Sequence, residues 1–152
     1  MGRRAILLLS AMATMMLVAG GVALAFTFTE GNDNCRGTAT RGADQLAMGG
    51  GNDRCAGLAR KDEIFGDHGR DDLSGDSGDD FVFGGSGADT VEGGFGDDFI
   101  NVSDHVAGND EVDCGVGTDR VVRDIDPRTG DRDVIANCDD NFTDVPVSPG
   151  GP

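Results

Sequence analysis

Apolar residues recur along this chain at every ninth position. Between residues 39 and 101 these positions hold Leu46, Cys55, Ile64, Leu73, Val82, Val91 and Ile100. The spacing matches neither the period of two of a long strand nor the period of about 3.6 of a helix. Glycine and aspartate dominate the residues in between. The pattern predicts short strands, each with one inward side chain, separated by turns.

A nine-residue frame underlies the pattern, and two tandem copies at 84–92 and 93–101 display it most clearly. Both follow Gly-Gly-x-Gly-x-Asp-x-apolar-x, with aspartate at position six and the apolar residue at position eight. Seven frames run from 39 to 101 without a gap, although Arg60 replaces the position-four glycine of one frame. Degenerate copies flank them near 31–35, 108–121 and 133–135, as expected for units that cap a stacked array.

The frame predicts an all-β fold in which each unit is a six-residue loop followed by a three-residue strand. Two units make one coil, so residues 18 apart stack on each other and the position-eight side chains form a thin core. The alternative is a disordered Gly/Asp-rich linker. A linker has no need of an apolar residue at every ninth position, so we favour the parallel β-solenoid.

The same register sorts the position-six aspartates into two edges of the solenoid. One edge carries Asp53, Asp71, Asp89 and, after an insertion, Asp110; the other carries Asp44, Asp62, Asp80, Asp98 and Asp119. Calcium takes six to eight oxygen ligands, which two stacked loops supply and one loop does not. We therefore predict calcium ions between stacked aspartates of each edge, namely between Asp53 and Asp71, Asp71 and Asp89, Asp62 and Asp80, and Asp80 and Asp98. The pair Asp44 and Asp62 is the least secure, because Arg60 brings a cation into its loop.

Glycines in the loops are predicted to assist the carboxylates, because they leave backbone carbonyl oxygens bare and able to approach a cation. The candidates at positions one and four are Gly66, Gly75, Gly84, Gly87, Gly93 and Gly96. Magnesium fits less well because it demands a small octahedral cage, and transition metals prefer the His or Cys ligands that the loops lack. Aspartates away from position six are interpreted as solvated surface charge.

These residues resemble the hemolysin-type calcium-binding repeat of the RTX family of bacterial secreted proteins. The resemblance covers about residues 31–135 and is strongest over 66–101. It implies a right-handed parallel β-roll with calcium in its turns, folding that depends on calcium, and a ligand role for Asp71, Asp80, Asp89 and Asp98. Family members usually join the roll to a protease, lipase or toxin. We expect no such effector to be attached here, and none of the toxin activities.

The N-terminus has the features of a secretory leader. Arg3 and Arg4 precede an apolar stretch, and Ala23-Leu24-Ala25 is an A-x-A cleavage signal, so cleavage is predicted near Ala25-Phe26. The alternative is a retained membrane anchor. The predicted organisation is a leader at 1–25, the repeat domain at 26–140 and a loose tail at 141–152. The protein is predicted to be secreted, with no stable membrane insertion after cleavage.

Acidic residues outnumber basic ones, with 28 Asp and Glu against 12 Lys and Arg and a formal net charge of −16. Loss of Arg3 and Arg4 with the leader leaves −18. Such a chain repels nucleic acid and anionic lipid, and it also repels itself. A compact state therefore needs counter-charge, which divalent cations supply.

Four cysteines, Cys35, Cys55, Cys114 and Cys138, follow the predicted leader, and an even count in an exported chain predicts disulfides. Three pairings exist, and we favour Cys35–Cys55 and Cys114–Cys138 because each links neighbouring coils. A zinc site is the poorer interpretation, because there is no C-x-x-C spacing.

The sequence favours a secreted calcium-binding protein with a structural or adhesive role over an enzyme. A hydrolase acting on an extracellular polymer is the alternative, since clustered aspartates resemble catalytic pairs. Their regular recurrence explains them better, and we predict no enzymatic activity. An extracellular or surface partner stays open. Five phenylalanines, Phe65, Phe81, Phe83, Phe95 and Phe99, either form an exposed strip that binds such a partner or only cover the coil faces.

Overall fold

The computed structural model describes most of the chain after the predicted leader. The described residues are 24–27, 29–35, 39–106, 108–126, 132–139 and 141–147. Residues 1–23 of the predicted leader (1–25) and residues 148–152 of the predicted tail lie outside these ranges. Among the residues described, no helix is long and apolar enough to cross a membrane.

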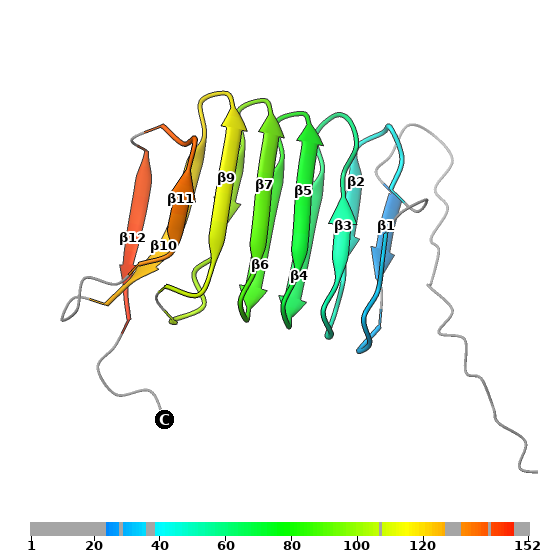
Figure 1. Cartoon of the computed structure of the whole chain (residues 1–152). Coiled ribbons are helices and arrows are strands. Elements are labelled where there is room, and N and C mark those ends of the chain that lie inside the picture. The colour runs from blue at the N-terminus through cyan, green and yellow to red at the C-terminus, as the bar shows by residue number, and fades with distance from the viewer. Residues whose placement is uncertain are drawn as a thin grey trace, which may run out of the picture.

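Every regular element in the described ranges is a β-strand. The strands are β1 (Leu24–Thr27), β2 (Asp44–Ala47), β3 (Arg54–Ala56), β4 (Glu63–His68), β5 (Asp72–Ser77), β6 (Phe81–Ser86), β7 (Thr90–Phe95), β8 (Phe99–Asn101), β9 (Glu111–Val116), β10 (Arg120–Ile125), β11 (Val134–Ala136) and β12 (Phe142–Pro146). From β2 onward, successive strands alternate between two sheets. The coils stack in a single row from β1 to β12 (Figure 1).

The first sheet has the order β1-β2-β4-β6-β8-β10-β12, and the second has the order β11-β9-β7-β5-β3. All neighbouring strands in both sheets pair in parallel. The chain thus forms a parallel β-solenoid, and the predicted all-β roll is confirmed.

Residues 18 apart stack in the regular part of the solenoid, as predicted. Ile64 on β4 pairs with Val82 on β6, and Val82 pairs with Ile100 on β8. Three extra residues enter the next coil, so Phe99 pairs with Arg120. The insertion lengthens one turn and leaves the strands in register.

The core is thin and consists of two rows of side chains between the two sheets. The position-eight residues Leu46, Cys55, Ile64, Leu73, Val82, Val91, Ile100, Val112 and Val121 are each at most 3% exposed. Position one also faces inward, where Met48, Val102 and Cys114 are buried and most other frames have glycine. The core is therefore narrow, and each coil buries few apolar side chains on its own.

The loops are shorter than predicted. Strands β4, β5, β6 and β7 each contain six residues and run from position seven of one frame to position three of the next. The turn comprises only positions four to six. The reason is that backbone pairing continues past the position-one and position-two residues, so that the Gly69 N–H still donates to the Ser86 carbonyl at 2.8 Å.

Both favoured disulfides are present, Cys35–Cys55 and Cys114–Cys138, each with a Cα–Cα distance of 5.0 Å. Cys35 and Cys55 are stacked inward residues of adjacent coils, so the bond replaces a core contact. The disulfides lie near opposite ends of the stack. They tie the terminal coils, which have fewest neighbours, to the coils beside them.

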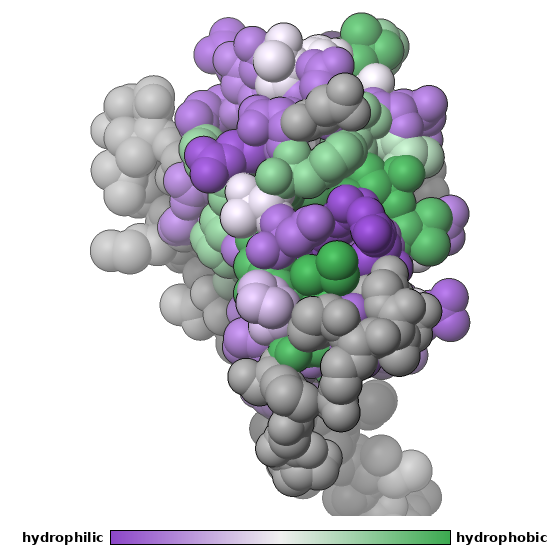
Figure 2. Space-filling model, turned by 90° about the vertical axis from the view of Figure 1, so that its left-hand side faces the viewer, coloured by the Kyte–Doolittle hydropathy of each residue, from purple (hydrophilic) through white to green (hydrophobic). Residues whose placement is uncertain are grey.

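The C-terminal end of the solenoid exposes apolar side chains. Val134 on β11 and Phe142 on β12 are 59% and 37% exposed. Figure 2, which views the molecule from this side, shows hydrophobic side chains bordered by hydrophilic ones.

Candidate metal centre

The position-six aspartates are buried, although aspartate normally lies at the surface. The nine predicted ligands Asp44, Asp53, Asp62, Asp71, Asp80, Asp89, Asp98, Asp110 and Asp119 are each at most 3% exposed. All except Asp44 directly precede a strand, and Asp44 is the first residue of β2. They form two columns, one along the starting edge of each sheet, as the register predicts.

One oxygen of each carboxylate after Asp44 accepts a backbone hydrogen bond from the preceding coil. The N–H of Asp62 donates to Oδ1 of Asp80 at 2.7 Å, and the N–H of Asp80 donates to Oδ1 of Asp98 at 2.8 Å. The other column repeats this pattern, with the Asp53 N–H donating to Asp71 and the Asp71 N–H donating to Asp89. Each aspartate therefore links two coils through its backbone and its side chain.

The second oxygen of most of these carboxylates has no hydrogen-bond partner among the described residues. The buried, unpartnered Oδ2 atoms belong to Asp53, Asp62, Asp71, Asp80, Asp89, Asp98 and Asp110. Leaving a buried polar atom unpaired costs about 1–3 kcal/mol, and more when the group is charged. A column of such atoms is therefore stable only if a proton or a cation satisfies it.

Position-one glycines leave gaps beside these free oxygens. A Cβ added to Gly75 would lie 2.6 Å from Oδ2 of Asp80 and 2.6 Å from the carbonyl oxygen of Gly93 in the next coil. Gly93 borders an equivalent gap between Oδ2 of Asp98 and the carbonyl of Cys114, at 2.7 and 2.5 Å. Carboxylate and carbonyl oxygens thus face one small space that only glycine keeps open.

Of the remaining predicted glycines, Gly66 lies in the same arrangement, whereas the gap at Gly84 faces the Val102 side chain in place of a carbonyl. Gly66 and Gly84 border Oδ2 of Asp71 and of Asp89. At position four, Gly87 and Gly96 have φ values of 140° and 131°, and a Cβ on either would overlap the position-four carbonyl of the preceding coil. These turns require glycine because adjacent backbones approach so closely.

This donor set fits a hard cation. Within the described ranges, no group of three or more His, Cys, Asp or Glu side chains gathers to hold a metal. An ion at these gaps would therefore take oxygens from carboxylates and backbone carbonyls of stacked turns, which is the combination that calcium accepts.

Residues 49–82 and 65–100 match the family model of the RTX calcium-binding nonapeptide repeat, which comprises four copies. The chain carries RTX repeats. No curated protein and no solved structure matches the chain. The matched segment spans β3 to β8, where the frame is most regular and the columns are complete.

Burial changes the acidity of the RTX aspartates. It raises the pKa of Asp80 to about 7 and that of Asp110 to about 8, from an ordinary value of 3.8. The hydrogen bond from the Asp62 N–H opposes the shift at Asp80, and the carboxylate of Asp98 adds to it. Burial likewise raises the pKa values of Asp62, Asp71 and Asp98 to about 6. Without a cation, these carboxyl groups stay protonated at pH values well above those at which aspartate normally ionises.

The N-terminal ends of both RTX columns are closed by threonines. Both carboxylate oxygens of Asp44 accept hydrogen bonds from Thr40, from its N–H at 2.6 Å and from its hydroxyl at 3.1 Å. The N–H and the hydroxyl of Thr29 both donate to Oδ2 of Asp33, and the Asp33 N–H donates to Asp53. Asp44 therefore differs from the aspartates after it, because its own oxygens are satisfied.

The structure adds two column members that the sequence argument did not assign, Asp33 and Asp133. Asp133 follows Asp110 and accepts the N–H groups of Gly108 and Asp124 at 2.9 and 2.8 Å. Both residues lie in the degenerate flanking copies. The signal was available in the local Gly-x-Asp-x-apolar pattern at Asp33, and in the Asp-x-apolar remnant at Asp133.

A further buried acid, Asp124, anchors the inserted turn before β9. Its side chain is 0% exposed and accepts the N–H groups of Asp104 and His105 and the hydroxyl of Ser103. Nothing in the sequence predicts this role, because its partners lie about 20 residues earlier and outside the frame. Aspartates away from position six are mostly exposed, as expected, including Asp67 and Asp79.

Proposed function

We propose that this chain is a secreted calcium-binding β-roll whose folding is coupled to calcium. The observation that carries the proposal is the row of buried Oδ2 atoms without partners, of which those from Asp62 to Asp98 lie beside a glycine gap, and most of these gaps also face a backbone carbonyl. The ligands would be the position-six aspartates from Asp53 to Asp110, helped by carbonyls of the turns. The weaker candidates are Asp44, whose oxygens Thr40 already satisfies, and Asp119 at the end of its column.

Calcium is favoured over other cations by the chemistry of the donors. The two histidines, His68 and His105, are exposed, and the cysteines are consumed in disulfides. Only oxygens line the gaps, which disfavours zinc and copper. Magnesium needs near-ideal octahedral geometry and keeps its waters, whereas calcium accepts the irregular mixture of carboxylate and carbonyl oxygens that stacked turns offer.

Coupling of folding to binding follows from the charge and the thin core. The chain carries a net charge of −16 and buries a column of carboxylates along each sheet edge. Because each coil has little apolar surface to bury, the cation contributes folding free energy directly. We expect affinities on the order of 10⁻⁴–10⁻³ M, which suit extracellular calcium.

Circular dichroism of the oxidised protein tests this coupling. Titration with calcium after chelation should convert a partly folded population into one with a full β spectrum, and the same concentration of magnesium should have little effect. The disulfides retain some local order, so the change is measured against the chelated, oxidised protein. A full β spectrum in the chelator would contradict the coupling.

We further propose that the protein acts outside the cell as a structural or adhesive element and has no catalytic role. Two disulfides support an oxidising location. RTX proteins are typically secreted. The regular recurrence of the acids supports a repeated metal site over a single catalytic pair. N-terminal sequencing of protein from the culture medium should begin near Phe26. A product that retains its leader in the membrane fraction would contradict secretion.

A further inference from the structure

Four phenylalanines pack together on the outer face of the first sheet. The rings of Phe65 and Phe83 stack at 4.8 Å, and Phe99 lies 5.7 Å from Phe81 and 6.0 Å from Phe83. All four are half-buried and lie on the neighbouring strands β4, β6 and β8. Phe95, grouped with them in the sequence analysis, instead projects from β7 of the other sheet and is 65% exposed.

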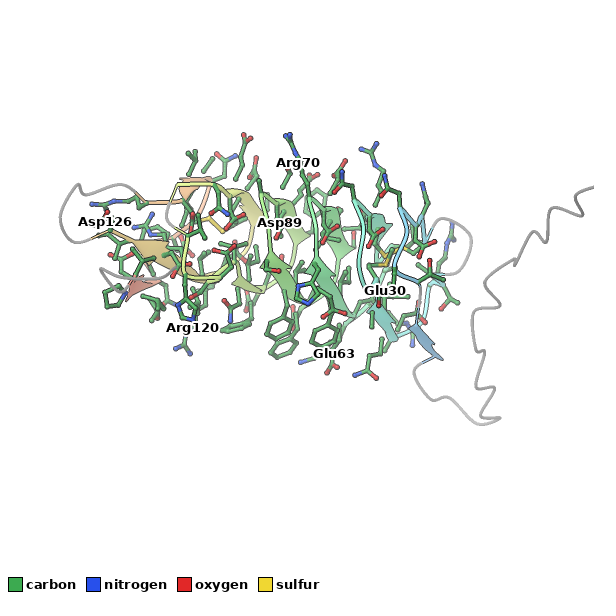
Figure 3. All side chains as sticks on the ribbon, turned by 90° about the horizontal axis from the view of Figure 1, so that it is seen from below. Glu30, Glu63, Arg70, Asp89, Arg120 and Asp126 are labelled. Carbon is green, nitrogen blue, oxygen red and sulfur yellow. A yellow bond between two sulfur atoms is a disulfide. The ribbon has the colours of Figure 1, made fainter. Side chains whose placement is uncertain are left out.

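One row of this face has charged residues of opposite sign at its ends. Pairing across the sheet places Glu63, Phe81, Phe99 and Arg120 side by side on β4, β6, β8 and β10. Figure 3 shows Glu63 and Arg120 on the same side of the ribbon, with aromatic rings between them. The order along the solenoid is acid, aromatic, aromatic, base. We call the half-buried phenylalanines with Glu63 and Arg120 the aromatic face.

This order is complementary to itself. A two-fold axis parallel to the strands and between β6 and β8 would place Glu63 of one copy opposite Arg120 of the other, twice. The same rotation places Phe81 opposite Phe99. In the adjacent row, Phe65 meets Val122 of the second copy. Such an isologous arrangement uses one patch on both copies, and it closes as a dimer.

Both charges are available for such a pairing. The ion pairs in the described part of the chain are Arg54–Asp72 and Arg123–Asp144. Glu63 accepts a hydrogen bond from Gln45 at the surface, and Arg120 lies over the Phe99 ring at 5.8 Å. Neither charge is neutralised within the fold.

We propose that the aromatic face is the interface of a homodimer of this chain. Aromatic residues and arginine are enriched in protein interfaces, and opposite charges at the rim fix the register of the two partners. In a chain of net charge −16, most other surfaces repel a second copy. The aromatic face is where packed rings and charges of both signs lie together, with Lys61 over the Phe81 ring at 4.1 Å. The inference goes beyond metal binding and does not depend on which cation the columns hold.

The face covers few strands, so we expect a weak dimer with dissociation in roughly the micromolar range. Sedimentation velocity of oxidised protein from the culture medium, in conditions where circular dichroism gives a β spectrum, should show a monomer–dimer equilibrium. Glu63→Arg and Arg120→Glu should each raise the dissociation constant about tenfold or more, because each creates two like-charged contacts. Glu92→Arg on the other sheet is the matched control and should leave dissociation unchanged.

The charge-swapped double variant Glu63→Arg/Arg120→Glu tests the two-fold geometry of the proposed dimer. It should restore dimerisation to within a few-fold of the original, and an equimolar mixture of the two single variants should form a heterodimer. Several results would overturn the proposal. They are a monomer at all concentrations, a dimer that ignores both single substitutions, or a double variant that is no better than the singles. Binding of a monomer to an extracellular polysaccharide through this face would also overturn it.

Discussion

At the scale of single residues, the position-six aspartates divide their two oxygens between two tasks. Oδ1 accepts a backbone N–H from the preceding coil and so holds the stack together. From Asp62 to Asp98, Oδ2 has no such partner and faces the glycine gap. The residue type is fixed by both demands at once. Asparagine satisfies the first and fails the second, because it brings no charge for a cation.

Asp80→Asn separates the two tasks. The amide oxygen still accepts the Asp62 N–H, and the new amide nitrogen faces the Gly93 carbonyl across the gap. The metal-free protein should therefore gain about 1 kcal/mol of stability, because a buried unpaired charge is removed. The calcium-bound protein should lose stability, with a midpoint for calcium-induced folding raised about tenfold. Urea unfolding with and without calcium measures both effects.

Asp79→Asn is the matched control, because it removes one negative charge from the adjacent, exposed position. It should shift both measurements by only a few tenths of a kcal/mol. If the two variants behave alike, the effect of Asp80 is general charge reduction, and the assignment of its Oδ2 to a cation is wrong.

At the scale of elements, the three-residue turn controls how closely the coils approach. Position-four glycines stack on one another, and the carbonyl of Gly69 points at the Cα of Gly87. The strands on either side pair with continuous registers, so one displaced turn strains both sheets. A change in turn geometry therefore also disturbs the pairing of the strands in both sheets.

Gly87→Ala tests this constraint. The substitution forces a left-handed φ of 140° on a residue with a Cβ and places that Cβ against the Gly69 carbonyl. We expect a loss of about 3 kcal/mol or more in the free energy of unfolding, measured by urea in saturating calcium. Gly31→Ala, where the nearest atom lies 3.8 Å away, should cost less than about 0.5 kcal/mol. Equal losses would contradict a special role for position four.

Sequence alone predicts the parts of the fold that repeat. The nine-residue period places Leu46 to Ile100 in the core and sorts the aspartates into two columns. It failed where contacts are not periodic. The partners of Asp124 lie in an inserted turn, and the extent of strands such as β4 depends on backbone pairing that carries no side-chain signal. Phe95 was grouped with the wrong residues, because position three of a frame lies on one sheet and position nine of the same frame lies on the other.

At the scale of the whole molecule, the buried columns make stability depend on protons and cations together. Burial raises several aspartate pKa values to between about 6 and about 8. The metal-free folded state then holds protons that the unfolded chain, with pKa values near 3.8, has already released. Its stability is present below pH 4 and declines as pH rises through the window up to about 8. Calcium competes with those protons, so its apparent affinity increases over the same window.

Thermal melts at several pH values measure this dependence. In chelator, the oxidised protein should melt at a higher temperature at pH 4.5 than at pH 8. In saturating calcium the order should reverse, because the carboxylates are then free to bind the ion. Melting temperatures in chelator that stay constant between these pH values would mean that the buried carboxylates do not titrate with folding.

The hydrogen bonds from one aspartate to the next run in one direction along each column. Each coil offers a donor N–H toward the C-terminal side and an acceptor carboxylate toward the N-terminal side, so a coil fits between any two others of its kind. An insertion of 18 residues would add one coil without disturbing the neighbouring coils. An insertion of nine would exchange the two columns and put every downstream strand in the opposite sheet. The unit by which such a protein can lengthen or shorten is therefore the pair of repeats.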